Sequence, residues 1–466
     1  MKSIPINALF LGSADIFVRL LSFIAVTYLA RTLGPANMGV LAVGMAILAY
    51  ASIFSNIGLP LLGVRHVAAK TDSIQNLIRR ICSTRFLLSV VTFNISTVIL
   101  LIWVEEPNTR NVAIIYLLTL FPSALLLEWL FQGLNKMKTL VVGQILGMAV
   151  YLLFVMGMVS NSLDLCWVPF AWCFGFLVQT IYYLSSYKKL CISDNSEKQP
   201  LHLFKTIKQG IPLGAASLIS QVIIQFPFIY LGFFDSTENA GLYSVAFRVV
   251  VLMLVIDRVF YTIFFPAVSQ SYKNSLEHLK ERVDWTLKIV TTGSLYVAIL
   301  AFIAGRNLLP IIFGSEFGDS VLIFQTLLGY FALTIINSVF TFTLIGMGKE
   351  RLYTKSLLVG AVVLVPIILI PLPLPATLTA PIALAVFHAV AMLMMVKYLK
   401  QFLSINLFLR VLLPMSIAIV IALVIGVFYH LYPALVTITA IIFTLPIIAF
   451  SSGINSRDLK YLKELI

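Results

Sequence analysis

Long apolar runs, each able to cross a lipid bilayer as a helix, dominate this sequence. A helical span takes roughly 20 apolar residues, whereas a barrel strand takes about 10 and alternates with a period of two. The runs in this chain are too long for barrel strands and lack that alternation, so we expect helices. The fourteen candidate spans lie near residues 8–30, 38–62, 86–103, 111–131, 139–160, 164–187, 210–234, 242–270, 285–304, 321–346, 354–372, 376–398, 411–430 and 433–450.

The composition points to the same class of protein. Apolar residues make up 60% of the chain and charged residues only 11%, where a soluble domain carries about 25% charged residues. We therefore predict an all-α polytopic membrane protein with 12–14 transmembrane helices. Met1 to Asn7 carries only Lys2, and no small-residue cleavage site closes the first run, so we expect that run to be kept as a helix.

The net charge of +13 is explained by topology rather than by a nucleic-acid partner. If the N-terminus is cytoplasmic, most of the 32 Lys and Arg fall in cytoplasmic loops, and only Arg31, Arg110 and Arg306 fall on the outer side. This asymmetry is the positive-inside rule. The sequence contains no GxxxxGK[ST] phosphate-binding loop, and its four cysteines show no CxxC spacing, so we expect no nucleotide, cofactor or metal.

An internal repeat divides the chain. Leu11–Val43 aligns without a gap with Leu213–Val245, and the shared residues include an Asn-x-Gly in each copy. Both copies begin on the cytoplasmic side, so the pattern predicts two pseudo-symmetric lobes of six helices. A second match supports this, because Gly133 and Lys136 align with Gly346 and Lys349 at the inner ends of two spans. The alternative is that unrelated helices end alike, with Gly followed by Lys. The expected parts are an N-terminal lobe (1–190), a basic cytoplasmic linker (191–209), a C-terminal lobe (210–400), and two peripheral helices with a basic tail (401–466).

Four segments carry a family resemblance: "LARTLGPANMGVLAV", "NIGLPLLGVRHVAA", "EWLFQGLNKMK" and "LLPIIFGSEF". Together they resemble the polysaccharide-transporter branch of the multidrug/oligosaccharidyl-lipid/polysaccharide exporter superfamily, and more narrowly the bacterial O-antigen flippases. The resemblance implies a V-shaped pair of lobes in the bacterial inner membrane. It also implies movement of a polyprenyl-diphosphate-linked oligosaccharide to the periplasmic leaflet, alongside polymerase and chain-length proteins of the same pathway.

Polar residues inside the predicted spans are candidates for contact with such a cargo, because buried charge is costly in a bilayer. Permanent cations would attract a diphosphate or acidic sugars. The alternative is that the charged residues form structural ion pairs between helices. The predicted cavity residues are Arg19, Arg248, Arg258, Asp15, Asp257, Gln221 and Gln225.

Other polar positions receive weaker predictions. Arg31 on one outer loop could form an ion-pair gate with Asp235 and Glu238 on the repeat-related loop. Glu128 is expected at the inner interface near Lys136, and Lys288 is expected to extend to the lipid headgroups. His388 is expected to be a neutral packed histidine rather than a proton-coupling site. Interhelical hydrogen bonds are expected of Asn56, Asn94, Gln144, Gln179 and Asn337.

Three functions fit a chain of this kind. The first is the lipid-linked oligosaccharide flippase, working by alternating access through a cationic cavity. The second is a cation-coupled multidrug exporter of the same superfamily, which would favour acidic and aromatic cavities over the three mid-membrane arginines. The third is an O-antigen polymerase or ligase, which should carry a large outer catalytic loop. All predicted outer loops are short, so we do not expect an enzyme.

Overall fold

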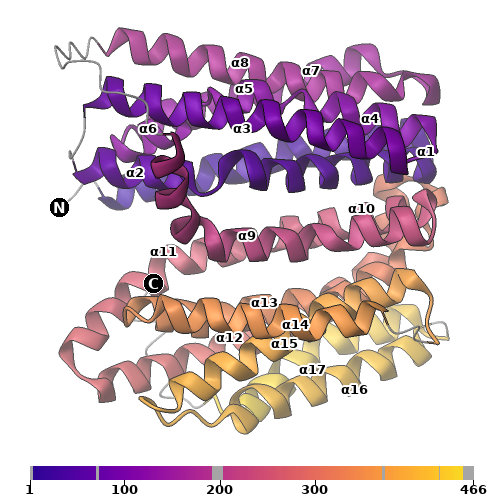
Figure 1. Cartoon of the computed structure of the whole chain (residues 1–466). Coiled ribbons are helices and arrows are strands. Elements are labelled where there is room, and N and C mark those ends of the chain that lie inside the picture. The colour runs from indigo at the N-terminus through magenta and orange to yellow at the C-terminus, as the bar shows by residue number, and fades with distance from the viewer. Residues whose placement is uncertain (1–3, 70–72, 191–202, 370–372, 430, 455–466) are drawn as a thin grey trace. The chain divides into compact units, whose positions relative to one another are not determined.

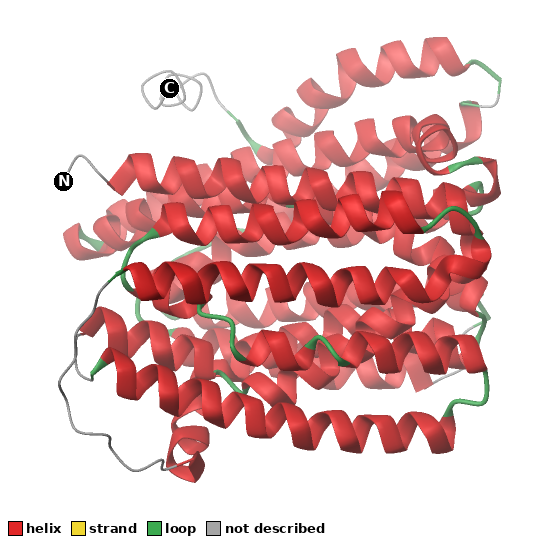
Figure 2. Cartoon of the chain, turned by 90° about the horizontal axis from the view of Figure 1, so that it is seen from above, coloured by secondary structure: helices red, strands yellow, loops and turns green. Residues whose placement is uncertain are grey.

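The computed structural model describes residues 4–69, 73–190, 203–369, 373–429 and 431–454. Side chains are not described for residues 4–15 or for a few positions in α9, α11 and α14, Arg258 among them. Every regular element in the described part is helical, as Figure 2 shows. The chain divides into two compact units, Met1–Val245 and Ala246–Ile466, and each is described by itself.

The first unit is built from the helices drawn in indigo to magenta in Figure 1. It comprises α1 (Ile4–Asn56), α2 (Leu59–Ala69), α3 (Ile74–Trp103), α4 (Pro107–Leu117), α5 (Leu120–Ala124), α6 (Glu128–Gly133), α7 (Met137–Met158), η1 (Ser162–Cys166), α8 (Trp167–Lys189), α9 (Leu203–Phe234) and the first half of α10 (Thr237–Met253). Helix α9 therefore packs with the first unit. The predicted lobe boundary at residues 190–210 comes from the repeat alignment and stays a prediction.

The second unit begins within α10 and contains the remaining helices. They are α11 (Val255–Asn274), α12 (Leu276–Phe313), η2 (Ser315–Phe317), α13 (Ser320–Gly346), α14 (Glu350–Leu369), α15 (Ala376–Leu399), η3 (Phe408–Leu412), α16 (Leu413–Phe428) and α17 (Pro433–Ser452).

Ten helices of the described chain are long and apolar enough to cross a membrane. Lipid offers no partner for backbone polar groups, so each span must satisfy them within its own helix. The predicted span at 8–30 and most of the one at 38–62 lie within α1, on either side of a break, and the end of the second falls in α2. The predicted span at 111–131 is divided among α4, α5 and α6.

The break in α1 arises from the Gly34-Pro35 pair. Gly34 has φ 74°, in the left-handed region that glycine tolerates, and Pro35 has no N–H to continue the hydrogen-bond ladder. The Asn37 side chain donates to the carbonyl of Leu33 at 3.0 Å, which satisfies an acceptor freed by the break. The predicted loop is thus a sharp bend between two helical halves.

The repeat-related copy of this motif lies at the start of α10. Asn239 occupies the position equivalent to Asn37, and its side-chain amide donates to the carboxylate of Asp235 at 2.8 Å. Its backbone N–H donates to the Ser236 hydroxyl at 3.1 Å. In both copies, therefore, the Asn side chain bonds the residue four positions earlier and fixes the start of the next helix.

The glycines of the two motifs bring the two helices into backbone contact. A Cβ placed on Gly39 would lie 1.6 Å from the carbonyl oxygen of Thr237, and one on Gly241 would lie 1.9 Å from that of Pro35. Thr237 is the repeat equivalent of Pro35, so the two contacts are related by the repeat. Each added Cβ would also lie 2.9 Å from the backbone nitrogen of the other glycine. Only residues without a side chain allow this crossing.

Helix α9 follows α1 and reaches α2. Gly232 accommodates Val43, whose Cγ2 would lie 2.2 Å from an added Cβ. Further along, the Tyr50 hydroxyl donates to the carbonyl of Val222 at 2.8 Å. At the break between α1 and α2, Gly58 packs against the backbone of Gly214. These contacts hold α9 against α1 at several levels.

The second unit has a core formed by α11, α12, α13 and α15. Val268, Leu287, Phe340 and Leu399 are among its fully or nearly fully buried side chains. A separate apolar cluster joins α12 to α16 and α17. Each helix in this unit thus buries one apolar face against a neighbour.

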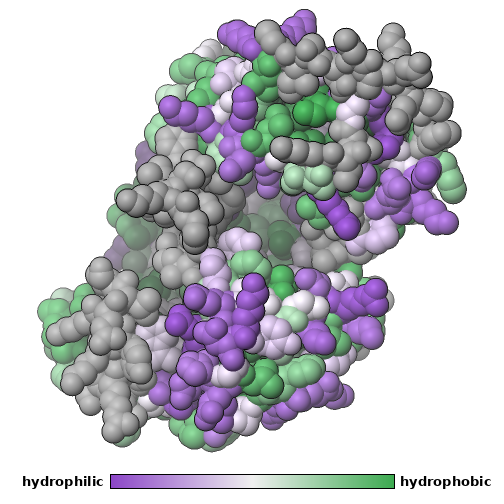
Figure 3. Space-filling model, turned by 90° about the vertical axis from the view of Figure 1, so that its left-hand side faces the viewer, coloured by the Kyte–Doolittle hydropathy of each residue, from purple (hydrophilic) through white to green (hydrophobic). Residues whose placement is uncertain are grey.

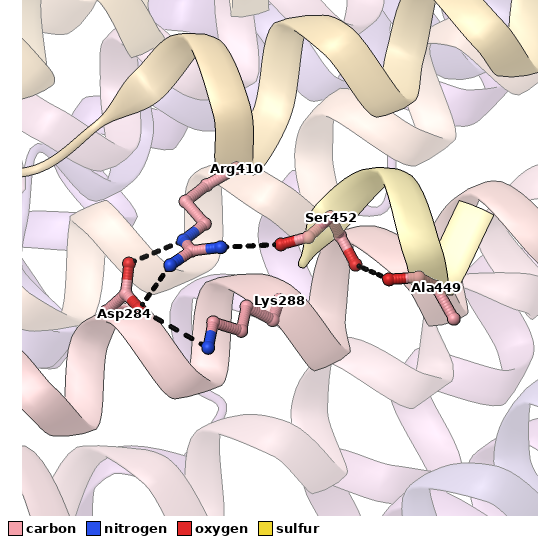
Figure 4. A network of polar contacts seen from close by, with 5 residues as sticks. All are labelled: Asp284, Lys288, Arg410, Ala449 and Ser452. Carbon is pink, nitrogen blue, oxygen red and sulfur yellow. Dashed lines mark hydrogen bonds and ion pairs between the residues drawn. The ribbon is translucent and has the colours of Figure 1, made fainter. Parts of the chain in front are cut away.

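An ion-pair network fixes the last two helices to α12 (Figure 4). The Arg410 guanidinium donates to both carboxylate oxygens of Asp284, at 2.7 and 3.0 Å, and to the carbonyl of Ser452 at 2.8 Å. Lys288 lies 3.7 Å from the same carboxylate. A bidentate pair of this geometry is both strong and directional. It therefore joins α12, η3 and the carboxyl end of α17.

We predict that Gly39→Ala and Gly241→Ala each destabilise the protein, because the new methyl group would overlap backbone atoms of the facing helix. Overpacking of this kind costs about 1–3 kcal/mol or more. Thermal unfolding in detergent should show a lower Tm for both variants. Gly157→Ala is the matched control, because a Cβ there meets nothing within 4 Å. Equal Tm values for all three variants would contradict the close crossing.

We also predict that Arg410→Met loosens the packing of α16 and α17 on α12. Loss of hydrogen bonds to a charged group costs about 1.5–3 kcal/mol, less here because Asp284 is partly exposed. Hydrogen exchange should rise in α16 and α17 and stay unchanged in the first unit. Lys397→Met, at an exposed position of α15, is the control. Unchanged exchange in α16 and α17 would show that the network does not hold them.

Candidate functional site

A cavity of about 350 Å³, which is largely open to its surroundings, lies in the first unit between α1, α2 and α9. It lies beside the break that separates α1 from α2. The residues that line it are Ala49, Ser52, Ile53, Asn56, Gly58, Pro60, Leu61, Gly214, Leu218 and Gln221. Ligand pockets in proteins typically occupy about 300–1,000 Å³.

Helical periodicity explains which residues reach this cavity. On α1 the lining positions 49, 52, 53 and 56 are three, four and seven residues apart, so they form one helix face. On α9 the positions 214, 218 and 221 have the same relation. Two helix faces therefore meet across the cavity, and α2 contributes Pro60 and Leu61.

The lining is mostly apolar and contains three uncharged polar side chains, Ser52, Asn56 and Gln221. Gln221 is a predicted cargo-contacting residue, and the structure places it in a cavity wall. Its role in contacting cargo stays a prediction. Gln225, one turn further along α9, is half-buried and is absent from this lining.

A buried arginine stands behind the cavity wall. Arg85 is only 5% exposed, and its Nε donates to Asn56 Oδ1 at 2.9 Å. Its Nη2 and Nη1 donate to the carbonyls of Ser123 at 2.6 Å and Leu126 at 3.3 Å. Those carbonyls lie at the break between α5 and α6, where the helical ladder is interrupted. Arg85 thus ties α3 to the ends of α1 and α5.

The charge asymmetry and the segment "SIQNLIRRICSTRF" predict Arg85 on a cytoplasmic loop, at the end of a short helix along the inner membrane surface, and the loop position was wrong. Helix α3 begins at Ile74, so Arg85 lies three turns inside it. The expected surface helix and the apolar run from residue 86 form one continuous helix, α3. The break between α5 and α6, whose carbonyls Arg85 satisfies, lies within the span predicted as continuous at 111–131, so the sequence carried no signal for a buried donor.

Glu128 belongs to a polar cluster at the start of α6. Its Oε1 accepts from Gln179 Nε2 at 2.7 Å and from Gln144 Nε2 at 3.3 Å. Tyr183, on the same helix as Gln179, donates to the carbonyl of Leu140 at 2.7 Å. The expected interface contact with Lys136 was therefore wrong, while the predicted interhelical bonds of Gln144 and Gln179 are confirmed.

The predicted charged residues are distributed over three helices. Arg19 and Arg248 are half-buried on α1 and α10. Asp257 on α11 accepts a hydrogen bond from the Ser338 hydroxyl on α13. The side chains of Asp15 and Arg258 lie outside the described residues, so the proposed pairs with Arg19 and Asp257 stay predictions.

The three predicted gate residues, Arg31, Asp235 and Glu238, are all exposed in the first unit. Asp235 accepts from Asn239, as described above. Their pairing across the outer loops stays a prediction.

Four further predictions can be compared with contacts. Asn337 Nδ2 donates to the carbonyl of His388 at 2.8 Å, and the His388 ring packs edge-on against Tyr330, which agrees with a packed histidine. Asn94 bonds the Val90 carbonyl of its own helix, so its expected interhelical bond was wrong. Lys288 is 8% exposed and pairs with Asp284 rather than extending outward.

The face of the molecule in Figure 3 carries many hydrophilic side chains. In the first unit the exposed basic residues include Arg65, Lys136, Lys189 and Lys205. In the second unit Lys273, near the end of α11, and Lys400, directly after α15, are exposed. Among the described residues, no group of three or more metal-ligating side chains is found.

Sequence comparison places this geometry in a known family. The family model described as "Polysaccharide biosynthesis protein" matches residues 6–272. A protein of Escherichia coli (strain K12) named "Putative O-antigen transporter" is 26% identical over 52% of this chain and 59% of its own length. A Shigella dysenteriae protein of the same name is 23% identical over 74% of this chain and 87% of its own length.

Two solved structures share the fold. The lipid II flippase MurJ in an inward closed conformation matches with a TM-score of 0.71 and 13% identity, over 97% of this chain and 100% of its own. An inward-facing multidrug resistance MATE family transporter matches with a TM-score of 0.64 and 14% identity, over 85% and 98%. The resemblance found from sequence motifs is thereby confirmed. The chain belongs to the polysaccharide biosynthesis protein family.

Proposed function

We propose that this chain is a flippase that moves a polyprenyl-diphosphate-linked oligosaccharide from the cytoplasmic to the periplasmic leaflet of the bacterial inner membrane. Family membership supports a role in polysaccharide biosynthesis, and the names of the two relatives support transport of an O-antigen-type cargo. The alignment with the first relative spans 59% of that protein, so its cargo is carried over here as part of the proposal.

The observation that carries the proposal is the amphipathic cavity between α1, α2 and α9. Such a cargo combines a hydrated glycan with an apolar chain, so its path must offer hydrogen bonds beside apolar surface. The cavity does so with Ser52, Asn56 and Gln221 among apolar neighbours. Polar residues inside a membrane domain cost free energy, so they are typically retained because they serve a function.

In the mechanism we propose, two lobes alternate access around the cargo while the lipid tail stays in the bilayer. The N-terminus is cytoplasmic, and the chain crosses the membrane twelve to fourteen times. Arg19, Arg248 and Arg258, with Asp15, Asp257 and Gln225, supply charge and hydrogen bonds along the path. Polymerase and chain-length proteins of the same pathway act on the cargo after it has crossed.

The matched fold is shared with a multidrug transporter, so drug export is the competing function. Among the described residues, the lining of the α1–α9 cavity contains no acidic side chain and no aromatic side chain. A site for cationic drugs would be expected to contain both, because cations bind carboxylates and aromatic faces. This observation favours the carbohydrate cargo.

We predict that Arg19→Ala, Arg248→Ala and Arg258→Ala each lower surface polysaccharide when the protein complements a strain that lacks its own O-antigen flippase. The loss of a cation that contacts the diphosphate should reduce display about tenfold or more, which is a change of roughly 1.4 kcal/mol. Silver-stained polysaccharide ladders at matched membrane levels provide the measurement. Lys397→Met, at an exposed position of α15, is the control.

If the wild-type chain restores display and all three variants do so equally, the cationic path is contradicted. If the wild-type chain restores no display and instead lowers sensitivity to cationic drugs, the flippase proposal gives way to drug export.

A further inference from the structure

We propose that the α1–α9 cavity is a carbohydrate subsite, which binds an uncharged sugar ring of the cargo rather than its diphosphate. This inference rests on the proposed function and assigns one part of the cargo to one set of residues. It also departs from the cationic cavity expected from the sequence, because the cavity wall that the structure describes is uncharged.

The lining has the chemistry that a sugar ring requires. A pyranose presents hydroxyl groups around its edge and C–H groups on its faces, so it needs hydrogen-bonding groups beside apolar surface. Ser52, Asn56 and Gln221 offer the hydrogen bonds. Ile53, Pro60, Leu61 and Leu218 offer the apolar surface. Amides suit hydroxyl groups because each can donate and accept.

Arg85 fixes the direction in which Asn56 presents its amide. The guanidinium Nε donates to Asn56 Oδ1 at 2.9 Å, so that oxygen is directed toward α3. The hydrogen bonds found for Asn56 side-chain atoms in the described structure involve this oxygen alone, which leaves Nδ2 as a donor for a bound ligand. A hydrogen bond from a cation to the oxygen polarises the amide and strengthens its N–H donors. Arg85 is therefore a positioning residue rather than a ligand contact.

The same geometry disfavours the diphosphate at this place. A phosphate group in a partly apolar cavity needs cations in direct contact, because an uncompensated buried charge is costly. Arg85 lies behind Asn56, and its Nε, Nη1 and Nη2 donate to protein oxygens. The guanidinium is absent from the cavity lining. The diphosphate must therefore be neutralised elsewhere along the path.

Backbone contact keeps the two polar faces at a fixed separation. A Cβ on Gly214 would lie 2.9 Å from the Cα of Gly58, and one on Gly210 would lie 2.4 Å from the carbonyl of Ile57. Helix α9 thus meets the α1–α2 break without intervening side chains. Gln221 lies two turns further along α9 and faces the same cavity as Asn56.

The test compares two lipids on the purified protein in proteoliposomes. One probe is polyprenyl diphosphate without a sugar, and the other is polyprenyl diphosphate that carries a neutral N-acetylhexosamine. The variants are Gln221→Leu, which removes the α9 amide, and Asn56→Asp, which keeps an acceptor for Arg85 but removes the Nδ2 donor. Asn94→Leu is the control, because Asn94 is an exposed α3 residue that bonds only its own helix.

We expect both variants to bind the sugar-bearing probe about tenfold more weakly than the wild type and to bind the sugar-free probe equally well. Arg85→Lys should weaken binding of the sugar-bearing probe alone, because the positive charge is kept while the fixed orientation of Asn56 is lost. Each variant should elute as a single species at the wild-type volume, which shows that it is folded.

Other results overturn the inference in distinct ways. If the variants bind both probes equally more weakly, the cavity contacts the diphosphate or the lipid chain. If binding of both probes is unchanged, the cargo does not enter the cavity. In both cases the wild type still transports, so the proposed function survives. If the wild type binds and translocates neither probe, the flippase proposal and the subsite fall together.

Discussion

The crossing of α1 and α10 at Gly39 and Gly241 is the contact on which the first unit depends. In lipid, helices gain little from apolar burial against one another, so close backbone approach supplies much of the packing energy. An added Cβ on either glycine would overlap a backbone carbonyl of the facing helix. The Asn residues two positions earlier fix the starts of both helices, which sets the angle at which they meet. Both copies of the repeated Asn-x-Gly are thus joined in one structural element.

From that crossing, the path of α9 along α1 creates the cavity. Gly232 packs against Val43 of α1, and Gly214 packs against Gly58 at the α1–α2 break. The Tyr50–Val222 hydrogen bond joins α1 and α9 between these two contacts. The lining residues then face one another from two helices and the α1–α2 break. Arg85 supports the wall from behind, because it satisfies the carbonyls freed between α5 and α6 and orients Asn56. The charge of Arg85 can be buried behind this cavity because its Nε, Nη1 and Nη2 all donate hydrogen bonds to protein oxygens.

Much of the fold follows from patterns that a sequence displays directly. The apolar runs predicted an all-helical membrane protein, and the Asn-x-Gly repeat indicated a structural relation that proved to be a physical contact. The site was harder to predict. Gln221 was found because it is polar within an apolar run, whereas Arg85 was missed because it lies in the polar first turns of α3, which resemble a short helix on the membrane surface. Glu128 was misplaced because its hydrogen-bond partners, Gln144 and Gln179, lie on other helices and away from it in sequence. Tertiary pairing of this kind leaves no local signal.

The central claim is that cargo occupies the cavity between α1 and α9. Thiol labelling in inside-out membrane vesicles tests it most directly, with Gln221→Cys in a chain whose four native cysteines are replaced by serine. A membrane-impermeant maleimide applied to inside-out vesicles should label this position, and labelling should slow when lipid-linked oligosaccharide accumulates. Ile99→Cys, exposed on α3, should remain unlabelled as a lipid-facing control. Labelling of Gln221→Cys at the same rate with and without accumulated cargo would contradict the account.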